Sequence, residues 1–318
     1  MLGAALVALS TFTPVAFAQP YPSKPLRLIL PDGTGGPADL RARQIGARMS
    51  DTLGQPVVID NRPGGNMIIG AEAAAKSAAD GYTLFLGNVV THSLNPWLFR
   101  NLPYRPNQDF EPITLVSAGP LIIVVNPQVP AKTLAELVEL AKLRPKQLDY
   151  ATLGRGTVTH LVMERLGVLA GVQFVPVPYK ATGAFIQDVV AGHLPIALNY
   201  WSIVGPYVKS GRLRALAVAS PRRLTVVPEL PTTAEAGFPG VEGPAWQGIF
   251  VPAGTPKPIV VRLHAAVAEA LNSPEIRNHI IETGGEVGGN TPEQFAAMIR
   301  SDQAHWKTMI ADAKIPPE

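Results

Sequence analysis

Cysteine is absent from this chain of 318 residues. A chain without thiols has no cysteine nucleophile, no zinc–thiolate site and no disulfide. Charged residues are also few, at 16%, and the net charge is only +3. The longest basic run is the pair Arg222-Arg223, so the basic face of a nucleic-acid-binding protein is missing. We therefore expect no nucleic-acid partner.

The common catalytic signatures are missing as well. The sequence contains no G-x-S-x-G elbow, no G-x-x-x-x-G-K-[ST] phosphate loop and no H-E-x-x-H zinc motif. We expect no metal, no cofactor and no catalysis. A Ser–His–Asp triad assembled from distant residues stays an open alternative, because geometry and not spacing defines such triads.

A long uncharged apolar run is found only at residues 2–18. It is short for a membrane span, and Ala16 and Ala18 fit a small-residue cleavage pattern before Gln19. We interpret residues 1–18 as a signal peptide and expect a periplasmic protein. The usual basic start is missing, since the first charge is Lys24, so the true start lies upstream or the recorded start is wrong. A plain N-terminal arm is the alternative.

Apolar runs and helical periodicity alternate along the rest of the chain. Residues 26–30 form a short apolar run before a glycine turn, which predicts a buried strand. Residues 38–53 have apolar positions three and four apart, and Pro37 suits the first position of a helix. The same analysis predicts further strands at 57–60, 82–86, 113–116, 121–125, 150–153, 172–177, 195–200, 214–219 and 246–252. It predicts further helices at 70–77, 134–141, 185–191, 203–209, 258–271 and 292–313, with one more ending at residue 166.

This alternation predicts the fold class. Strands alternating with helices are typical of α/β folds with parallel sheets. The pattern restarts after Asp109, so the most economical architecture is two α/β lobes with a cleft between them. We place the crossovers near residues 112–117 and 243–250. The lobes are then 19–117 and 244–318 for the first and 118–243 for the second.

A glycine loop at residues 33–36 joins the first predicted strand to the first long helix. In open α/β sheets ligands bind at the carboxyl ends of strands, where helix amides are unpaired and the dipole favours an anion. Gly33, Thr34 and Gly35 therefore indicate an anion site. Asp39 is expected to accept loop amides and hold the loop rigid, since it would repel a bare carboxylate. A glycine turn without ligand and a dinucleotide fingerprint ending at Asp60 are alternatives; an exported protein disfavours the second.

A second glycine loop follows the strand predicted at 150–153. It contains Gly154, Arg155, Gly156 and Thr157. Arg155 suits a bidentate pair with a carboxylate, although a solvated surface arginine is an equal alternative. Thr157 is a good helix N-cap, or its hydroxyl faces a ligand. His160 and Glu164 share a helix face, and we expect His160 to close the loop and not to bind metal.

Three other strand ends carry polar or aromatic side chains. Tyr179 and Lys180 follow one strand, and Asn199, Tyr200 and Trp201 end another. Asn199 can donate to a carboxylate without adding charge, and Asn88 is similarly placed after a third strand. The aromatic residues wall the cleft or simply fill the core.

Taken in order, these segments resemble the Bug-type periplasmic receptors, which are the substrate-binding proteins of tripartite tricarboxylate transporters. The resemblance covers essentially the whole mature chain. Its landmarks are Gly35-Gly36-Pro37-Ala38-Asp39, Asn61-Arg62-Pro63-Gly64, Asp80-Gly81-Tyr82-Thr83-Leu84, Gly154-Arg155-Gly156-Thr157, Val177-Pro178-Tyr179-Lys180, Leu213-Arg214-Ala215-Leu216-Ala217 and Pro252-Ala253-Gly254-Thr255-Pro256. Singly these are weak, but their order is highly specific.

The resemblance implies a type II periplasmic-binding-protein fold, a carboxylate enclosed between two lobes and delivery to membrane permease subunits. It places Gly33, Thr34, Gly35 and Asp39 in the site, with Asn88 facing them, and Gly154 to Thr157 on the second lobe. We add Thr152, Tyr179, Asn199 and Trp201 as site residues and expect a monomer.

The sequence departs from the family pattern in ways that bear on the ligand. Pro195 and Asn199 stand where aspartates are frequent, and Thr152 and Thr157 stand where serines are common. The loss of two acids favours a plain di- or tricarboxylate, or an aromatic acid, over an amino acid. An exported hydrolase and a receptor that signals to a sensor are the alternative functions.

Overall fold

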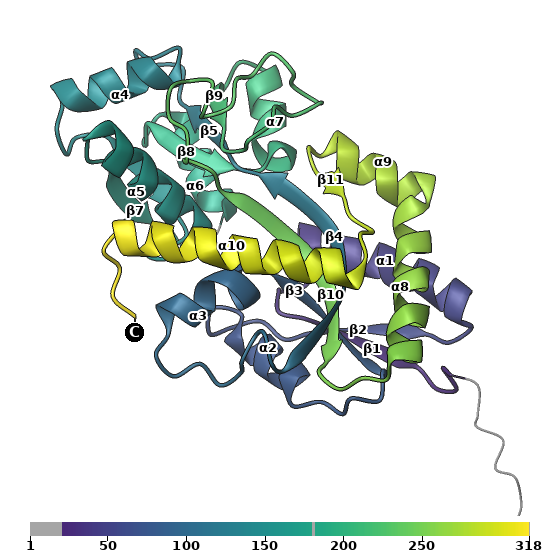
Figure 1. Ribbon diagram of the computed structural model, residues 1–318. Coiled ribbons are helices and arrows are strands. Elements are labelled where there is room, and N and C mark those ends of the chain that lie inside the picture. Colours follow the sequence, from purple (N-terminus) through teal and green to yellow (C-terminus); the bar gives the residue numbers. More distant parts are fainter. Residues whose placement is uncertain (1–20, 180–181, 318) are drawn as a thin grey trace, which may run out of the picture.

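The computed structural model describes residues 21–179 and 182–317. The proposed signal peptide and Lys180 lie outside these residues. The described chain forms two β-sheets surrounded by helices (Figure 1). The predicted α/β class with two lobes is therefore confirmed.

The first sheet, within the described residues, has six strands in the order β11-β4-β10-β3-β1-β2. Their bounds are β1 Leu26–Leu30, β2 Val57–Asn61, β3 Thr83–Asn88, β4 Phe110–Pro120, β10 Pro244–Pro252 and β11 Glu286–Val287. β1 is parallel to β2 and β3, and β10 is antiparallel to β3 and β4. Leu28, Ile29 and Leu30 are fully buried, as expected for a strand that helices cover on both faces.

The second sheet, counted over the same part of the chain, has five strands in the order β7-β6-β8-β5-β9. Their bounds are β5 Ile122–Val125, β6 Asp149–Thr152, β7 Val175–Pro178, β8 Ile196–Asn199 and β9 Arg214–Val218. β6 is parallel to β7 and β8, and β5 is antiparallel to β8 and β9. The carboxyl ends of β6, β7 and β8 therefore lie at one edge of this sheet.

Two long strands link the sheets. The chain leaves the first sheet at the end of β4, enters the second at β5, and returns from β9 to β10. β4 and β10 are paired along their length, from Pro120 opposite Pro244 to Phe110 opposite Pro252, with two irregularities in register. The chain thus changes sheets near the predicted crossovers, while the lobe boundaries themselves stay a prediction.

The helices follow most of the predicted pattern. Their bounds are α1 Pro37–Leu53, α2 Ile68–Ala75, α3 Asn95–Leu98, α4 Leu134–Leu143, α5 Val158–Ala170, α6 Thr182–Ala191, α7 Trp201–Lys209, α8 Lys257–Asn272, α9 Pro274–Glu282 and α10 Pro292–Asp312. α1 begins at Pro37 and ends before Gly54, whose φ of 68° makes a left-handed cap. The patterns did not predict α9, β11, α3 or the π-helical turn η1 (Val90–Leu94), which are short. The start signal of α9, Ser273-Pro274-Glu275, was nevertheless present.

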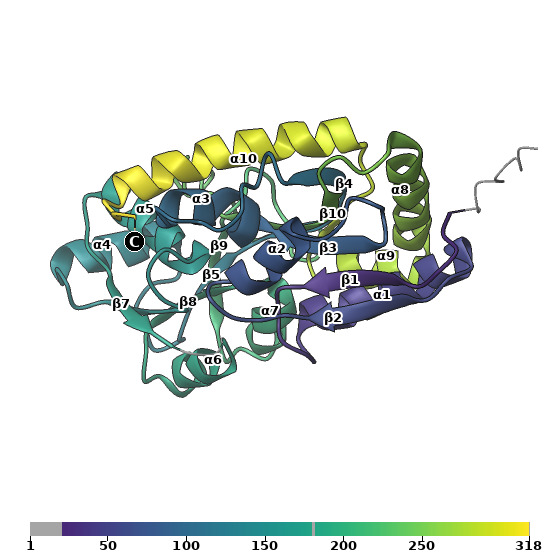
Figure 2. The same cartoon turned by 90° about the horizontal axis from the view of Figure 1, so that it is seen from below.

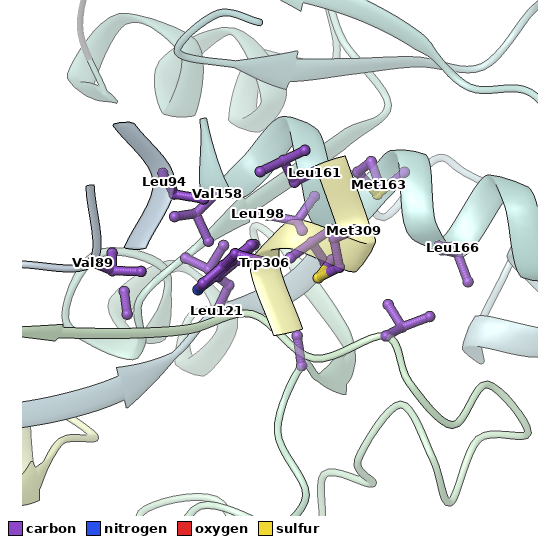
Figure 3. Packing of buried hydrophobic residues seen from close by; sticks show 14 of the residues in the cluster. Val89, Leu94, Leu121, Val158, Leu161, Met163, Leu166, Leu198, Trp306 and Met309 are labelled. Carbon is purple, nitrogen blue, oxygen red and sulfur yellow. The ribbon is translucent and has the colours of Figure 1, made fainter. Parts of the chain in front are cut away.

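The long helix α10 packs against elements of both lobes (Figures 1 and 2). It contacts β4 and η1 of the first lobe and α5 of the second. Trp306 and Met309 of α10 lie among Leu161, Leu198 and Leu121 (Figure 3). One hydrophobic cluster therefore runs from the first sheet through α10 into the second. None of the helices in the described part of the chain has the length and apolar character that a membrane-spanning segment requires.

Asp302 anchors α10 to the crossover strand β10. Its buried carboxylate accepts hydrogen bonds from the indole nitrogens of Trp246, at 2.8 Å, and Trp306, at 3.0 Å. We expect Asp302→Ala to lower the free energy of unfolding by about 2–4 kcal/mol, because two buried donors lose their acceptor. Urea denaturation measures this. The exposed Arg300→Ala on the same helix serves as control and should change the free energy by less than about 0.5 kcal/mol. Equal stability of the two variants would contradict this role.

Candidate ligand-binding site

The first glycine loop joins β1 to α1, and Asp39 in the first turn of α1 holds it in place. Gly33, Thr34 and Gly35 are exposed, and Gly35 has a φ of 80°. The Asp39 side chain is buried and accepts hydrogen bonds from the Gly35 amide, at 2.9 Å, and from Asn61 Nδ2, at 3.0 Å. Asp39 therefore holds the loop, as expected. Both carboxylate oxygens accept hydrogen bonds from the protein, so Asp39 positions the loop.

The electrostatics of Asp39 agree with this role. Arg43 Nε donates to its carboxylate at 3.0 Å. Hydrogen bonds from Arg43, the Gly35 amide and Asn61 lower the pKa of Asp39 to about 2. The carboxylate thus stays ionised at any physiological pH, and the loop is fixed over that whole range.

Asn88 ends β3 and is used mainly for local structure. Its Oδ1 accepts hydrogen bonds from the amides of Val90, at 3.0 Å, and Thr91, at 3.1 Å, at the start of η1. Its Nδ2 lies 3.0 Å from the sulfur of Met67. The Asn88 side chain is buried. Its oxygen binds the start of η1, and its amide nitrogen points to Met67 instead.

The second glycine loop joins β6 to α5 and is closed by hydroxyl groups. The hydroxyls of Thr152, Thr157 and Thr159 lie 3.0 to 3.1 Å from one another. Thr157 also donates to the Gly154 carbonyl at 2.7 Å, so its side chain does not cap the helix amides. Gly154 and Gly156 have φ values of 121° and 78°, which side chains rarely adopt.

His160 closes this loop from the helix, as expected. Its Nδ1 accepts from the Gly156 amide at 3.4 Å. Burial and, to a smaller extent, the charge of Arg155 lower the pKa of His160 to about 4. The ring is therefore neutral near pH 7 and can accept this hydrogen bond.

Arg155 reaches from this loop toward the first lobe. It is exposed and lines a cavity of about 200 Å³ together with Asn66, Leu98 and Phe99 of the first lobe and with Ile315 and Pro316. A Cβ added at Gly156 would lie 3.0 Å from the Leu98 side chain, so the loop touches the first lobe. A cavity of about 630 Å³ lies elsewhere, beside β9 and the start of α4, and contains none of the predicted site residues.

Tyr179 and Asn199 are engaged within the second lobe, whereas Trp201 also meets the first lobe. The Tyr179 hydroxyl donates to Asp188 at 2.6 Å, and Asn199 Oδ1 accepts from the Tyr200 amide at 2.9 Å. Trp201 is buried in the core, next to Gly284 of the turn between α9 and β11. Tyr200 keeps 37% of its surface exposed and is the aromatic residue of this strand end that solvent reaches.

Asp32 and Arg41 are charged groups that the sequence analysis did not select. Asp32 follows β1 directly, and Arg41 lies in the second turn of α1. Both influence the pKa of Tyr200, which burial and then Asp32 raise to about 12. Since Tyr200 belongs to the second lobe, these three groups lie where the lobes face each other. Asn88 was selected because it lies at the end of a predicted strand, and the same argument could have selected Asp32. No local sequence pattern marks Arg41.

Arg41 is held by the two crossover strands. Its Nη1 donates to Ser117 Oγ of β4 and to Gln247 Oε1 of β10, each at 2.9 Å. Neither Ser117 nor Gln247 was selected from the sequence, because their partner lies far away in the chain. Within residues 21–179 and 182–317, no group of three His, Asp or Glu side chains is arranged to hold a metal ion.

Comparisons with known proteins show which family the chain is related to. Residues 41–315 match the family described as Tripartite tricarboxylate transporter family receptor. Protein BugT of Bordetella pertussis is 34% identical over 300 residues, which cover 93% of this chain and 91% of that protein. The R. palustris protein Rpa4515 with adipate has 34% identity and a TM-score of 0.84, covering 94% of this chain and 100% of that one. MatC from Rhodopseudomonas palustris with bound malate has 33% identity and a TM-score of 0.79, covering 91% and 100%.

Asp32 supplies a pH test of the site. Burial raises its pKa from 3.8 to about 6, so protonation favours the folded state. This contribution to stability falls as the pH rises from about 4 to about 6. The wild type should therefore lose about 2 kcal/mol of unfolding free energy through Asp32 between pH 4 and pH 7. We expect the Asp32→Asn variant not to show this loss. Thermal denaturation across this range measures it.

The control for this test is Asp39→Asn, whose effect should have the opposite sign. The pKa of Asp39 is lowered, so its stabilisation is present above the ordinary pKa of 3.8 and is lost as the pH falls toward 2. Replacing the Asp39 carboxylate by an amide should therefore destabilise the protein at pH 7. An Asp32→Asn variant with the wild-type pH dependence would show that Asp32 is well solvated.

Proposed function

The chain belongs to the family of tripartite tricarboxylate transporter receptors, and from this premise we propose that it is an extracytoplasmic receptor for a small carboxylate. The carboxylate is a di- or tricarboxylate or an aromatic acid, bound between the two lobes. The protein then delivers it to the membrane subunits of a tripartite transporter. We propose that it acts without catalysis and without a cofactor.

One observation carries this proposal: the first glycine loop leaves backbone amides without acceptors, and the second glycine loop presents the exposed Arg155. Among the described residues, no acceptor bonds the amides of Gly33, Thr34 or Gly36. Each loop precedes the start of a helix, where unpaired amides and the dipole favour an anion. Arg155 adds a positive charge on the second loop. Such groups suit a carboxylate.

The polar side chains of the loops support the same proposal. Asp39 fixes the first loop, and Thr152, Thr157 and His160 fix the second, so the free amides of the first loop and the Arg155 side chain are the donors left for a ligand. Rigid donors that need no rearrangement bind with a smaller entropic cost. Closure of the lobes would remove water from the bound carboxylate and strengthen these hydrogen bonds.

The finer assignments belong to the same proposal. We propose that residues 1–18 direct export to the periplasm and that the mature chain from Gln19 is a monomer. We further propose that residues 19–117 and 244–318 act as the first lobe and 118–243 as the second. Their relative motion on binding is what the permease subunits detect.

A ligand screen tests the proposed function. The mature protein from Gln19 is melted with malate, adipate, succinate, citrate, glutamate and benzoate, because a ligand of the folded state raises the melting temperature. We expect a concentration-dependent shift with at least one of these carboxylates, and calorimetry then gives its dissociation constant. No binding of any of them would contradict the carboxylate assignment.

Two variants test whether the glycine loops are the site. We expect Gly35→Val to weaken binding of the ligand found by about tenfold or more, because a φ of 80° forces a Val-bearing loop out of shape. We expect Arg155→Ala to weaken it by a similar factor through loss of a charge-assisted hydrogen bond.

Matched controls separate binding from stability. Gly54→Val imposes similar strain, at a φ of 68° with open space around the Cβ, at the other end of α1. The exposed Arg144→Ala removes one charge from the second lobe. Both should bind the ligand as the wild type does. Normal binding by Gly35→Val and Arg155→Ala together would mean that the site lies elsewhere.

A further inference from the structure

Arg41 is a half-buried cation near the proposed site. Only some of its N–H donors have a hydrogen-bond acceptor. Its Nη1 is bound by the neutral oxygens of Ser117 and Gln247. Its Nε is buried without any hydrogen-bond partner among the described residues. The guanidinium carries five N–H donors, so most of its capacity is free.

The positive charge of Arg41 also lacks a protein counter-ion. Other arginines close to it on the same helix are paired: Arg43 with Asp39, and Arg48 with Glu275. No carboxylate of the described residues forms an ion pair with Arg41, and burial lowers its pKa. A cation in this position costs free energy that an anion would offset.

Arg41 lies beside the proposed carboxylate site. It is about one turn along α1 from the first glycine loop, on a helix whose first amides face that loop. The charge of Tyr200, from the second lobe, influences the pKa of Arg41, so the guanidinium lies close to the opposite wall. Ser117 and Gln247 belong to the crossover strands and fix its position between the lobes.

We propose that Arg41 is a specificity-determining residue that binds the second acidic group of a diacid, whose first carboxylate lies on the glycine loops. This inference rests on the proposed function and narrows the substrate class to short diacids. Nη2 of Arg41 makes no hydrogen bond among the described residues and is not buried, so its donors are the ones that meet the carboxylate of the ligand. A monoacid would leave the charge of Arg41 unpaired in the closed protein.

Calorimetry at pH 7 with two matched pairs of acids tests this inference. Succinate is compared with butyrate, and adipate with hexanoate, so that one carboxylate is replaced by a methyl group in each pair. We expect the wild type to bind the preferred diacid at least tenfold more tightly than its monoacid. Arg41→Gln should weaken diacid binding about tenfold or more and change monoacid binding less than threefold.

Two further variants keep the test sharp. Arg48→Gln removes the same charge from an exposed site on the same helix and should keep the full diacid preference. Arg41→Lys keeps the charge but loses the planar fork, and its preference should lie between those of the wild type and Arg41→Gln. It also serves if Arg41→Gln does not fold, and an Arg41→Lys variant with no preference would overturn the inference.

The outcomes separate this inference from the proposed function. Equal binding of diacid and monoacid by the wild type, or equal losses for both in Arg41→Gln, would overturn the role of Arg41 and leave a carboxylate receptor. Failure of the wild type to bind any acid of these pairs or of the wider carboxylate screen would overturn both. A loss confined to diacids would support both.

Discussion

The antiparallel pairing of β4 with β10 is the constraint on which the rest of the structure depends. These strands link the two sheets, and their ladder runs from Pro120 opposite Pro244 to Phe110 opposite Pro252. Because both crossovers are tied together, the two sheets are held in a defined arrangement relative to each other. The same two strands supply Ser117 and Gln247, which hold Arg41. Asp302 then fastens α10 to β10 through Trp246, so one helix steadies both lobes.

Most of the polar side chains near the proposed site bind other parts of the protein. Asp39 holds the first loop, and the threonine hydroxyls with His160 hold the second. Backbone amides are thereby presented at fixed positions, which suits a carboxylate whose oxygens accept several hydrogen bonds. This arrangement is general for any carboxylate. Discrimination among carboxylates must come from the few side chains that are not already engaged.

Asp32, Arg41 and Tyr200 are such side chains. They come from β1, α1 and the end of β8, and they influence one another across the space between the lobes. Their combination of one anion, one cation and one neutral hydroxyl is polar and directional. Trp201, in contrast, is buried in the core of the second lobe. Tyr200 is therefore the aromatic residue of this strand end that can contact a ligand.

The sequence by itself determined the α/β class, most strands and helices, both glycine loops and the role of Asp39, because each depends on local periodicity, turn chemistry or a spacing of four residues. It missed α9, although the start signal of this helix is present, and η1, which has only five residues. Only the tertiary structure decided that Tyr200 and not Trp201 is exposed, and that Arg41 meets Ser117 and Gln247. Those contacts join residues separated by 76 and 206 positions. No local pattern encodes a partner at that distance, since the pairing arises only when β4 and β10 bring the two lobes together.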